Sequence, residues 1–331
     1  MQILVITPKR WAPLLLAALL LAPLLSSAFA QEPYPNRPVR LVVPFPPGGI
    51  ADVVARVVGQ KLGELWGQQA VIDNRTGASG TLGADAVAKA TPDGYTLLLT
   101  TGDFITTPSL MPKMAFNPNK DLIPIVMIAR GPLLLGANAQ SGIASLEDLL
   151  TKAKADPRKI AFSSPGNGTI NHLAVEWLAI EAGLKLQHIP YRGGVPAATG
   201  VAAGDVPIGA LTPSSAAPFV EAGKVKILAL MTKERPSFAP PDWPTLAEKG
   251  LAVDAALWVG LFAPAGTPEP ILSRLNEEVL RILKDETVRQ RLNSVGTEAS
   301  AISRADFVER IRVDAERYSR VIDQVGIRIQ P

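Results

Sequence analysis

The chain has 331 residues, a formal net charge of +3 and no cysteine. The absence of cysteine excludes disulfides, thiolate catalysis and cysteine-ligated zinc. A net charge this close to zero argues against a nucleic-acid-binding protein, which typically carries a basic patch or stripe.

The first 30 residues have the pattern of a secretory signal peptide. Lys9 and Arg10 supply positive charge, Leu14 to Leu25 form a short apolar core, and a small-x-small pattern ends at Ala30. The apolar core is shorter than the roughly 20 residues that a membrane-spanning helix needs, so a membrane anchor is the weaker alternative. We therefore expect export to the periplasm, cleavage near Ala30 and a soluble mature protein whose length suits two domains.

A strand, a glycine loop and a helix follow one another between residues 39 and 66. The β-branched run Val39 to Val43 predicts a buried strand, which the three prolines and two glycines of Pro44 to Gly49 end. The apolar spacing from Ile50 to about Trp66 predicts a helix. Its start leaves unpaired N–H groups and a positive dipole end near the glycines, which together form an anion site. The alternative is an ordinary turn in which Asp52 supports its own helix.

The same order of strand, loop and helix continues to residue 103. Strands are expected at Ala70–Asp73 and Tyr95–Thr100, with a helical run at about Leu82–Ala90 between them. This order predicts a parallel sheet covered on both faces. The loop at 75–80 matches neither a Walker sequence nor the dinucleotide spacing. The loop from Thr100 to Asp103, which includes Thr101, follows a strand end, where open α/β sheets bind ligands, so it is a second candidate wall of the pocket. An ordinary polar turn is an equal alternative.

Residues 105–120 contain several prolines and are expected to be irregular. Two apolar runs between Leu122 and Asn138 then predict a long extended crossover between two domains. Leu146 to Ala155 is expected to be a helix capped by Ser145.

A second anion-binding loop is predicted at residues 165–169. It joins a strand at 160–164 to a helix at 170–182, and Ser164 and Thr169 add hydroxyl groups. His172 lies in the first turn of the helix, so it is a candidate ligand residue. A structural role is the more frequent one for a lone histidine.

Further strands and helices follow in the same style. A strand at 186–190 precedes Tyr191, Arg192 and Gly193, and a helix is expected from about 197 to 203. Arg192 would either pair with a ligand carboxylate or face solvent, and the second outcome is commoner. The remaining expected elements are strands at 206–211, 226–231 and 256–263, a polar loop at 212–215, and helices at 245–249, 270–284 and 304–325.

An enzymatic role is not favoured by the sequence. His172 and His188 permit a Ser-His-Asp set on paper, but no Gly-x-Ser-x-Gly elbow is present. No His-x-x-x-His pattern or carboxylate cluster indicates a catalytic metal. We therefore expect no enzyme, no metal and no cofactor.

The run from Phe45 to Asp52 (FPPGGIAD) resembles the first-loop signature of the Bug-type extracytoplasmic solute receptors, the periplasmic components of tripartite tricarboxylate transporters. Further stretches are similar to the same family, in the same order, and cover essentially all of the mature chain. They are residues 71–83, 92–98, 163–173, 190–194, 244–250 and 262–268.

The resemblance implies an α/β, two-lobed periplasmic-binding-protein fold of type II, in which each lobe is a sheet flanked by helices and the ligand cleft lies between them. With the predicted crossover, it places domain 1 at 31–130 with 229–331 and domain 2 at 131–228. It also implies a small organic acid held by loop backbone and hydroxyl groups, often through ordered water. The expected substrate-binding residues are Phe45, Pro47, Gly48, Gly49, Asp52, Thr101, Ser164, Gly166, Thr169, His172, Tyr191 and Gly193.

Two segments depart from the family pattern. The acidic residue after Gly204, Asp205, comes early, and a proline stands at position 207. The loop from Thr100 to Thr107 lacks the usual serine-rich, histidine-containing form. These departures leave the identity of the ligand open but not the fold.

The expected function is therefore a periplasmic receptor that captures a small carboxylate, either an organic acid or an acidic amino acid. It would deliver this ligand to the membrane subunits of a tripartite tricarboxylate-type transporter. The alternative is a ligand sensor that feeds a signalling partner, because the same cleft closure serves either output. No nucleic-acid partner is expected, and a monomer is expected because no exposed apolar stripe stands out.

Overall fold

The structure is a computed structural model that describes residues 34–77, 80–111, 114 and 116–328. The predicted signal peptide lies outside these residues. In the part of the chain that is described, no helix has the length and apolar character needed to cross a membrane.

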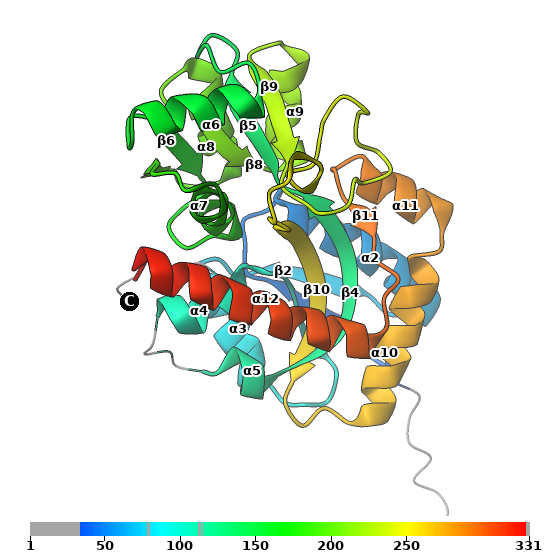
Figure 1. Cartoon of the computed structure of the whole chain (residues 1–331). Coiled ribbons are helices and arrows are strands. Elements are labelled where there is room, and N and C mark those ends of the chain that lie inside the picture. Colours follow the sequence, from blue (N-terminus) through cyan, green and yellow to red (C-terminus); the bar gives the residue numbers. More distant parts are fainter. Residues whose placement is uncertain (1–33, 78–79, 112–113, 115, 329–331) are drawn as a thin grey trace, which may run out of the picture. The chain divides into compact units, whose positions relative to one another are not determined.

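Two mixed sheets, both within the unit formed by residues 37–331, organise the chain (Figure 1). The first sheet has the order β11-β4-β10-β3-β1-β2. Strand β1 pairs in parallel with β2 and β3, whereas β10 runs antiparallel to β3 and β4. Its strands are β1 (Val39–Val43), β2 (Ala70–Asn74), β3 (Thr96–Thr101), β4 (Leu122–Pro132), β10 (Ala256–Pro264) and β11 (Glu298–Ala299).

The second sheet has the order β7-β6-β8-β5-β9. Strand β6 is parallel to β7 and β8, and β5 is antiparallel to β8 and β9. Its strands are β5 (Leu134–Asn138), β6 (Ala161–Ser164), β7 (Gln187–Pro190), β8 (Ile208–Leu211) and β9 (Val225–Leu230). The expectation of parallel sheets is thus only partly met, because the strands near the crossovers, β4, β5 and β10, pair antiparallel with their neighbours.

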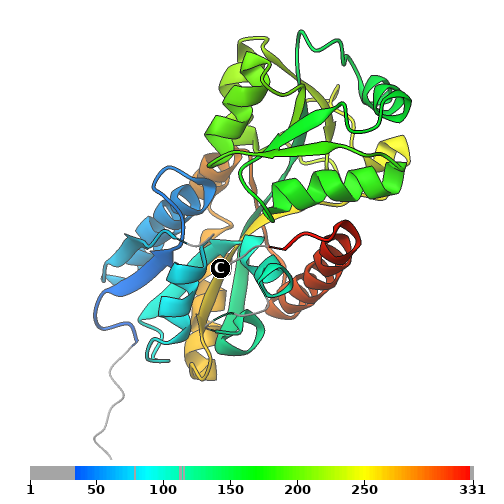
Figure 2. The same ribbon diagram turned by 90° about the vertical axis from the view of Figure 1, so that its left-hand side faces the viewer.

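Helices flank both sheets, as the predicted fold class requires (Figure 2). They are α2 (Ile50–Trp66), α3 (Thr81–Ala88), α4 (Asp103–Leu110), α5 (Pro118–Asp121), α6 (Leu146–Ala155), α7 (Ile170–Ala182), α8 (Gly194–Ala203), α9 (Pro213–Glu221), α10 (Glu269–Ile282), α11 (Glu286–Asn293) and α12 (Arg304–Val325), with a short 3-10 helix η4 (Ala247–Lys249).

Two segments predicted to be loops are helices instead. In α4, Pro108 argues against a helix, but Phe104, Ile105 and Leu110 are buried and tertiary packing overrides the local preference. In α9, Pro213 stands at the first helical position, where its missing N–H is not needed, and Thr212 forms a capping box with Ser215.

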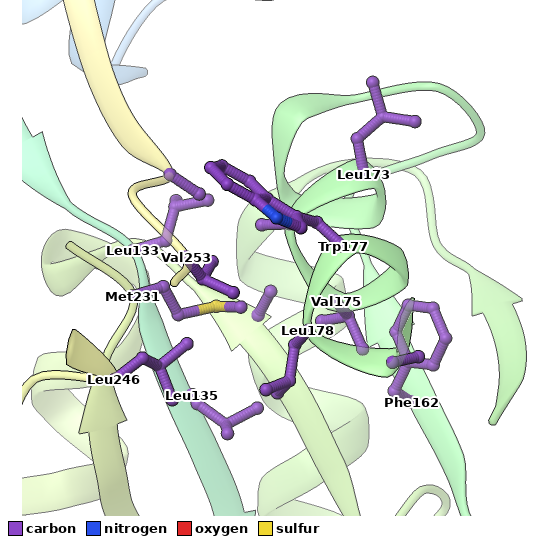
Figure 3. Packing of buried hydrophobic residues seen from close by; sticks show 14 of the residues in the cluster. Leu133, Leu135, Phe162, Leu173, Val175, Trp177, Leu178, Met231, Leu246 and Val253 are labelled. Carbon is purple, nitrogen blue, oxygen red and sulfur yellow. The ribbon is translucent and has the colours of Figure 1, made fainter. Parts of the chain in front are cut away.

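The two sheets are joined at a buried crossing point. A single residue, Leu133, separates β4 from β5, and its carbonyl accepts a 2.8 Å hydrogen bond from the N–H of Met231, which follows β9. The Met231 carbonyl in turn accepts from Ala255 at 2.7 Å. Leu133 and Met231 are fully buried in one hydrophobic cluster with Trp177 and Leu178 of α7 (Figure 3). The two connections therefore support each other.

Helix α12 packs against α4, α7 and β4. Its Phe307 meets Trp258 of β10 edge-on, with ring centroids 5.3 Å apart. Gly260 lies beneath this ring, and a Cβ at that position would be 2.5 Å from Phe307 Cζ. The absence of a side chain at Gly260 thus allows the helix to sit close to the sheet.

We expect Gly260→Ala to lower the free energy of unfolding by about 1–3 kcal/mol, because the added methyl group overpacks the contact with Phe307. Urea unfolding of the purified protein measures this change. Gly63→Ala, in α2, is the matched control, because its Cβ would meet nothing closer than 3.4 Å. The explanation fails if Gly260→Ala unfolds at the wild-type urea concentration or if Gly63→Ala is destabilised as much.

Candidate functional site

A cavity of about 630 Å³ lies where loops from both sheets meet. From the first sheet it is lined by residues 45–51, by Thr101, Asp103, Thr106, Thr107, Leu110 and Met111, and by Leu257. From the second sheet it is lined by residues 165–169, Asn171, residues 193–196, Thr212, Ser214 and Ser215. The cavity thus has walls from segments that are far apart in the sequence.

The position of the cavity follows from the strand directions. The lining loops leave the carboxyl ends of β1 and β3 in one sheet and of β6, β7 and β8 in the other. Parallel strands end at the same edge of a sheet, and open α/β sheets bind ligands there. Each loop leads into a helix, so the first turns or caps of α2, α4, α7, α8 and α9 all line the cavity. Their positive dipole ends favour an anion.

The first-loop glycines stand at the start of α2. Gly48 has a φ of +84°, a conformation that favours glycine, and its N–H donates to Asp52 Oδ2 at 2.9 Å. Helix α2 has no side-chain cap. No described residue accepts a hydrogen bond from the amides of Ile50 or Ala51, so both remain available to a ligand.

Asp52 supports this loop from outside the cavity. Its side chain is 3% exposed, and it accepts hydrogen bonds from Arg56, the Gly48 amide and Asn74. Burial alone would raise the pKa of Asp52, but these hydrogen bonds together hold the pKa below its usual range. Asn74 also donates to the Phe45 carbonyl at 3.1 Å, so it ties the loop to β2. Asp52 is not among the residues that line the cavity.

The start of α8 resembles that of α2. Gly193 has a φ of +116° and donates its N–H to the Pro165 carbonyl at 3.0 Å, which links this loop to the loop before α7. Helix α8 also lacks a side-chain cap, and no described residue accepts from the amides of Gly194 or Val195. These two amides form a second available donor pair.

The starts of α7 and α9 are already capped. Thr169 accepts from the His172 amide at 3.3 Å, and Asp103 Oδ1 accepts from the Ile170 amide at 2.8 Å. Thr212 and Ser215 cap α9 reciprocally. The helix starts without a side-chain cap are therefore those of α2, α4 and α8, and α4 alone among these three carries an acidic residue, Asp103, that lines the cavity.

Two stacked histidines lie behind the loop at 165–169. The rings of His172 and His188 are parallel within 12°, with centroids 3.6 Å apart. Gly168 donates its amide to His172 Nδ1 at 3.0 Å, and His188 Nε2 lies 2.7 Å from the hydroxyl of Ser164. Burial, with a smaller contribution from His172, lowers the pKa of His188 to about 3. This arrangement holds the loop in place.

Tyr191 also lies outside the lining of the cavity, next to the loop that precedes α8. Its hydroxyl occupies the space where a Cβ on Gly200 of α8 would be. Its ring packs against the hydrophobic cluster of the second sheet, and burial, followed by the charge of Asp205, raises the pKa of its phenol. Arg192 is exposed and does not line the cavity, which agrees with the solvent-facing alternative.

The structure brings most of the sequence-predicted site residues together. Phe45, Pro47, Gly48, Gly49, Thr101, Gly166, Thr169 and Gly193 line the cavity. The other four, Asp52, Ser164, His172 and Tyr191, lie outside its lining and contact the loops that form it. Whether any of the twelve binds a ligand stays a prediction.

Several lining residues were missed in the sequence. They are Thr106, Thr107, Asn171, Thr212, Ser214 and Ser215, whereas Asp103 belongs to the loop after β3 that was predicted as a candidate wall. Five of these residues follow β3 or β8, where polar side chains at a strand end were the available signal, but the helices α4 and α9 that orient them were not expected. Asn171 lies in α7, which was expected. Asp103 is the one charged side chain among the described residues of the lining. The described part of the chain also holds no cluster of ligating side chains suited to a metal ion.

The His188 pKa predicts a pH dependence of stability. Because the folded pKa is about 3 and the ordinary value is 6.5, the unfolded chain binds more protons between these values. The free energy of unfolding should therefore fall as the pH drops from 6.5 towards 3. His188→Gln should remove about 1–2 kcal/mol of the loss measured between pH 7 and pH 5 by urea unfolding. Equal losses in variant and wild type would contradict this origin.

Relatives of this chain are found among bacterial proteins of similar length. The UPF0065 protein in the tcbD-tcbE intergenic region of Pseudomonas sp. (strain P51) is 35% identical over 312 residues, which is 93% of this chain and 92% of the relative. The protein BugT of Bordetella pertussis (strain Tohama I) is 32% identical over 310 residues, which is 92% of this chain and 94% of BugT.

Solved structures share the fold. R. palustris Rpa4515 with adipate has a TM-score of 0.80 and 33% identity, and the match covers 88% of this chain and 98% of that one. MatC (Rpa3494) from Rhodopseudomonas palustris with bound malate has a TM-score of 0.77 and 32% identity, covering 87% and 100%. A family model for the tripartite tricarboxylate transporter family receptor matches residues 54–327. The chain therefore belongs to the family of tripartite tricarboxylate transporter receptors, as the sequence resemblance predicted.

Proposed function

We propose that this protein is a periplasmic solute receptor that captures a small carboxylate in the cavity and delivers it to the membrane subunits of a tripartite tricarboxylate-type transporter. Membership of a family of periplasmic solute receptors supports the receptor role. Two relatives of the same fold were solved with dicarboxylates, adipate and malate, which supports an organic acid as the ligand class.

One observation carries the proposal: five helix starts surround one cavity, and three of them, those of α2, α4 and α8, have no side-chain cap. The carboxylate of Asp103 lies in the first turn of α4 and disfavours a second anion there. Backbone N–H groups and helix dipoles bind anions without a matched arginine. No described lining residue is cationic. We therefore assign the ligand carboxylate to the amides of Ile50 and Ala51 on one side and of Gly194 and Val195 on the other.

The energetics suit a transport receptor. A hydrogen bond to a charged group contributes roughly 1.5–3 kcal/mol, so three or four of them outweigh the costs of ordering and closure. The balance corresponds to micromolar affinity, about −8 kcal/mol. The volume of about 630 Å³ also lies within the range of small-molecule sites. Phe45, Ile50, Leu110 and Leu257 offer apolar surface to the carbon skeleton.

Ligand capture also requires movement. We propose that domain 1 (31–130 with 229–331) and domain 2 (131–228) close on the ligand by bending at the crossing connections next to Leu133 and Met231. Closure of this kind presents a new surface to a membrane partner. The hydrogen bond between the Met231 amide and the Leu133 carbonyl, which links the two connections, supports this position for the hinge.

A thermal-shift screen with a panel of organic acids tests the proposal. A ligand that binds only the folded protein raises the melting temperature by mass action, and we expect at least one small carboxylate to do so. Uptake of that acid by cells should then require the gene. If cells that lack the gene still take up the acid, a signalling role is favoured instead. If no acid in the panel raises the melting temperature, the carboxylate assignment is wrong.

We expect Gly49→Val to weaken binding of the acid identified by the screen at least tenfold, because the side chain would stand beside the amides of Ile50 and Ala51. Gly49 is the better test than Gly48, because its φ of −72° suits any residue and its Cβ would meet nothing closer than 3.5 Å. Isothermal titration calorimetry measures the affinity.

Gly63→Val is the matched control, since it makes the same change in α2 at a position that does not line the cavity. The melting temperatures of both ligand-free variants report whether they fold. Unchanged affinity in a folded Gly49→Val protein would show that the first loop is not the carboxylate site.

A further inference from the structure

Asp103 carries the one charged side chain among the described residues that line the cavity. Its carboxylate forms a hydrogen bond that links the first sheet to the second. It follows β3 directly and opens α4, so the first sheet positions it. Its Oδ1 accepts from the Ile170 amide at the start of α7, which belongs to the second sheet, at 2.8 Å. Its Oδ2 accepts from the Thr101 hydroxyl at 2.7 Å. The carboxylate is thus held in one orientation by two donors.

The Asp103 carboxylate occupies the position at the start of α7 where a ligand anion would otherwise bind. Helix starts attract carboxylates, and at α7 the protein supplies its own, together with the Thr169 cap. At α2 and α8 no side chain caps the helix, and Asp52, in the first turn of α2, accepts from the Gly48 amide but does not line the cavity. A ligand carboxylate therefore finds donors at α2 and α8, whereas at α7 it meets a negative charge.

The Asp103 end of the cavity is suited to a hydrogen-bond donor. An ionised carboxylate offers about four acceptor positions, and two of those on Asp103 are used. Thr107, which is 4% exposed, lines the same cavity, and its hydroxyl makes no hydrogen bond to a described residue. No cationic side chain in the described lining would offset a second negative charge.

We propose that the ligand is an amino acid-like monocarboxylate, with one carboxylate at the α2 and α8 amides and an ammonium group at the other end facing Asp103, and that Asp103 makes this selection. The inference rests on the proposed function, because it assumes that the cavity binds an acid. Such a preference would separate this chain from the two relatives solved with dicarboxylates.

Calorimetry with ligands of matched length tests the selection on the wild-type protein. Adipate, 6-aminohexanoate and hexanoate share a six-carbon chain and differ only at one end, and succinate, 4-aminobutanoate and butanoate form a four-carbon series. In the series whose chain length suits the cavity, we expect the amino acid to bind about tenfold more tightly than the diacid. The affinity of the plain monoacid should lie between these two values.

Asp103→Asn tests the residue. The amide oxygen can still accept from Ile170, but the negative charge is gone. We expect affinity for the amino acid to fall about tenfold and affinity for the diacid of the same length to rise. Asp306→Asn is the matched control. Asp306 also lies in the first turn of a helix and accepts a hydroxyl hydrogen bond at 2.7 Å, from Ser303, but it does not line the cavity.

The outcomes separate the two proposals. If no acid in either series or in the organic-acid panel binds, the proposed function itself is wrong. If diacids bind the wild type as tightly as the amino acids, or if Asp103→Asn leaves the preference unchanged, only the Asp103 assignment is wrong. Should the variant fail to fold, the wild-type comparison within each series still decides.

Discussion

The site depends on one geometric constraint: a helix that follows a parallel strand begins at the carboxyl edge of the sheet. This constraint applies to β1 and β3 in one sheet and to β6, β7 and β8 in the other. Because both edges contribute to one cavity, the positive ends of five helices share it. Attraction for an anion is thus a property of the topology and does not need a basic side chain.

The loops that form the cavity are held by side chains behind them. Asp52 fixes the loop before α2 by accepting from the Gly48 amide, and Asn74 ties the same loop to β2 through the Phe45 carbonyl. His172 accepts from the Gly168 amide on the other side. Rigid loops lower the ordering cost of binding, since fewer groups lose freedom when a ligand arrives. These residues are therefore important to the site without facing it.

Local patterns in the sequence were sufficient for much of the fold. The bounds of β1, α2, α6, α7 and α12 agree with those expected from hydrophobic spacing and caps. The prolines in α4 and α9 misled the prediction, because a proline reads as a breaker until its position in the helix and the packing around it are known. The mixed direction of the sheets was also missed, since pairing between strands far apart in the sequence leaves no local pattern.

Most of the strands, glycine loops and helix starts could be predicted from the sequence, because backbone preferences and hydrophobic periodicity act over a few residues, but α4 and α9 could not. The sequence also carried the family resemblance, since ordered short stretches along the chain are a property of sequence alone. Which of these loops share a cavity, and which side chains support the loops from outside it, depends on the packing of the two sheets. Asp103 shows the difference: its contact with the Ile170 amide joins residues 67 positions apart, and only the packing of the two sheets brings them together.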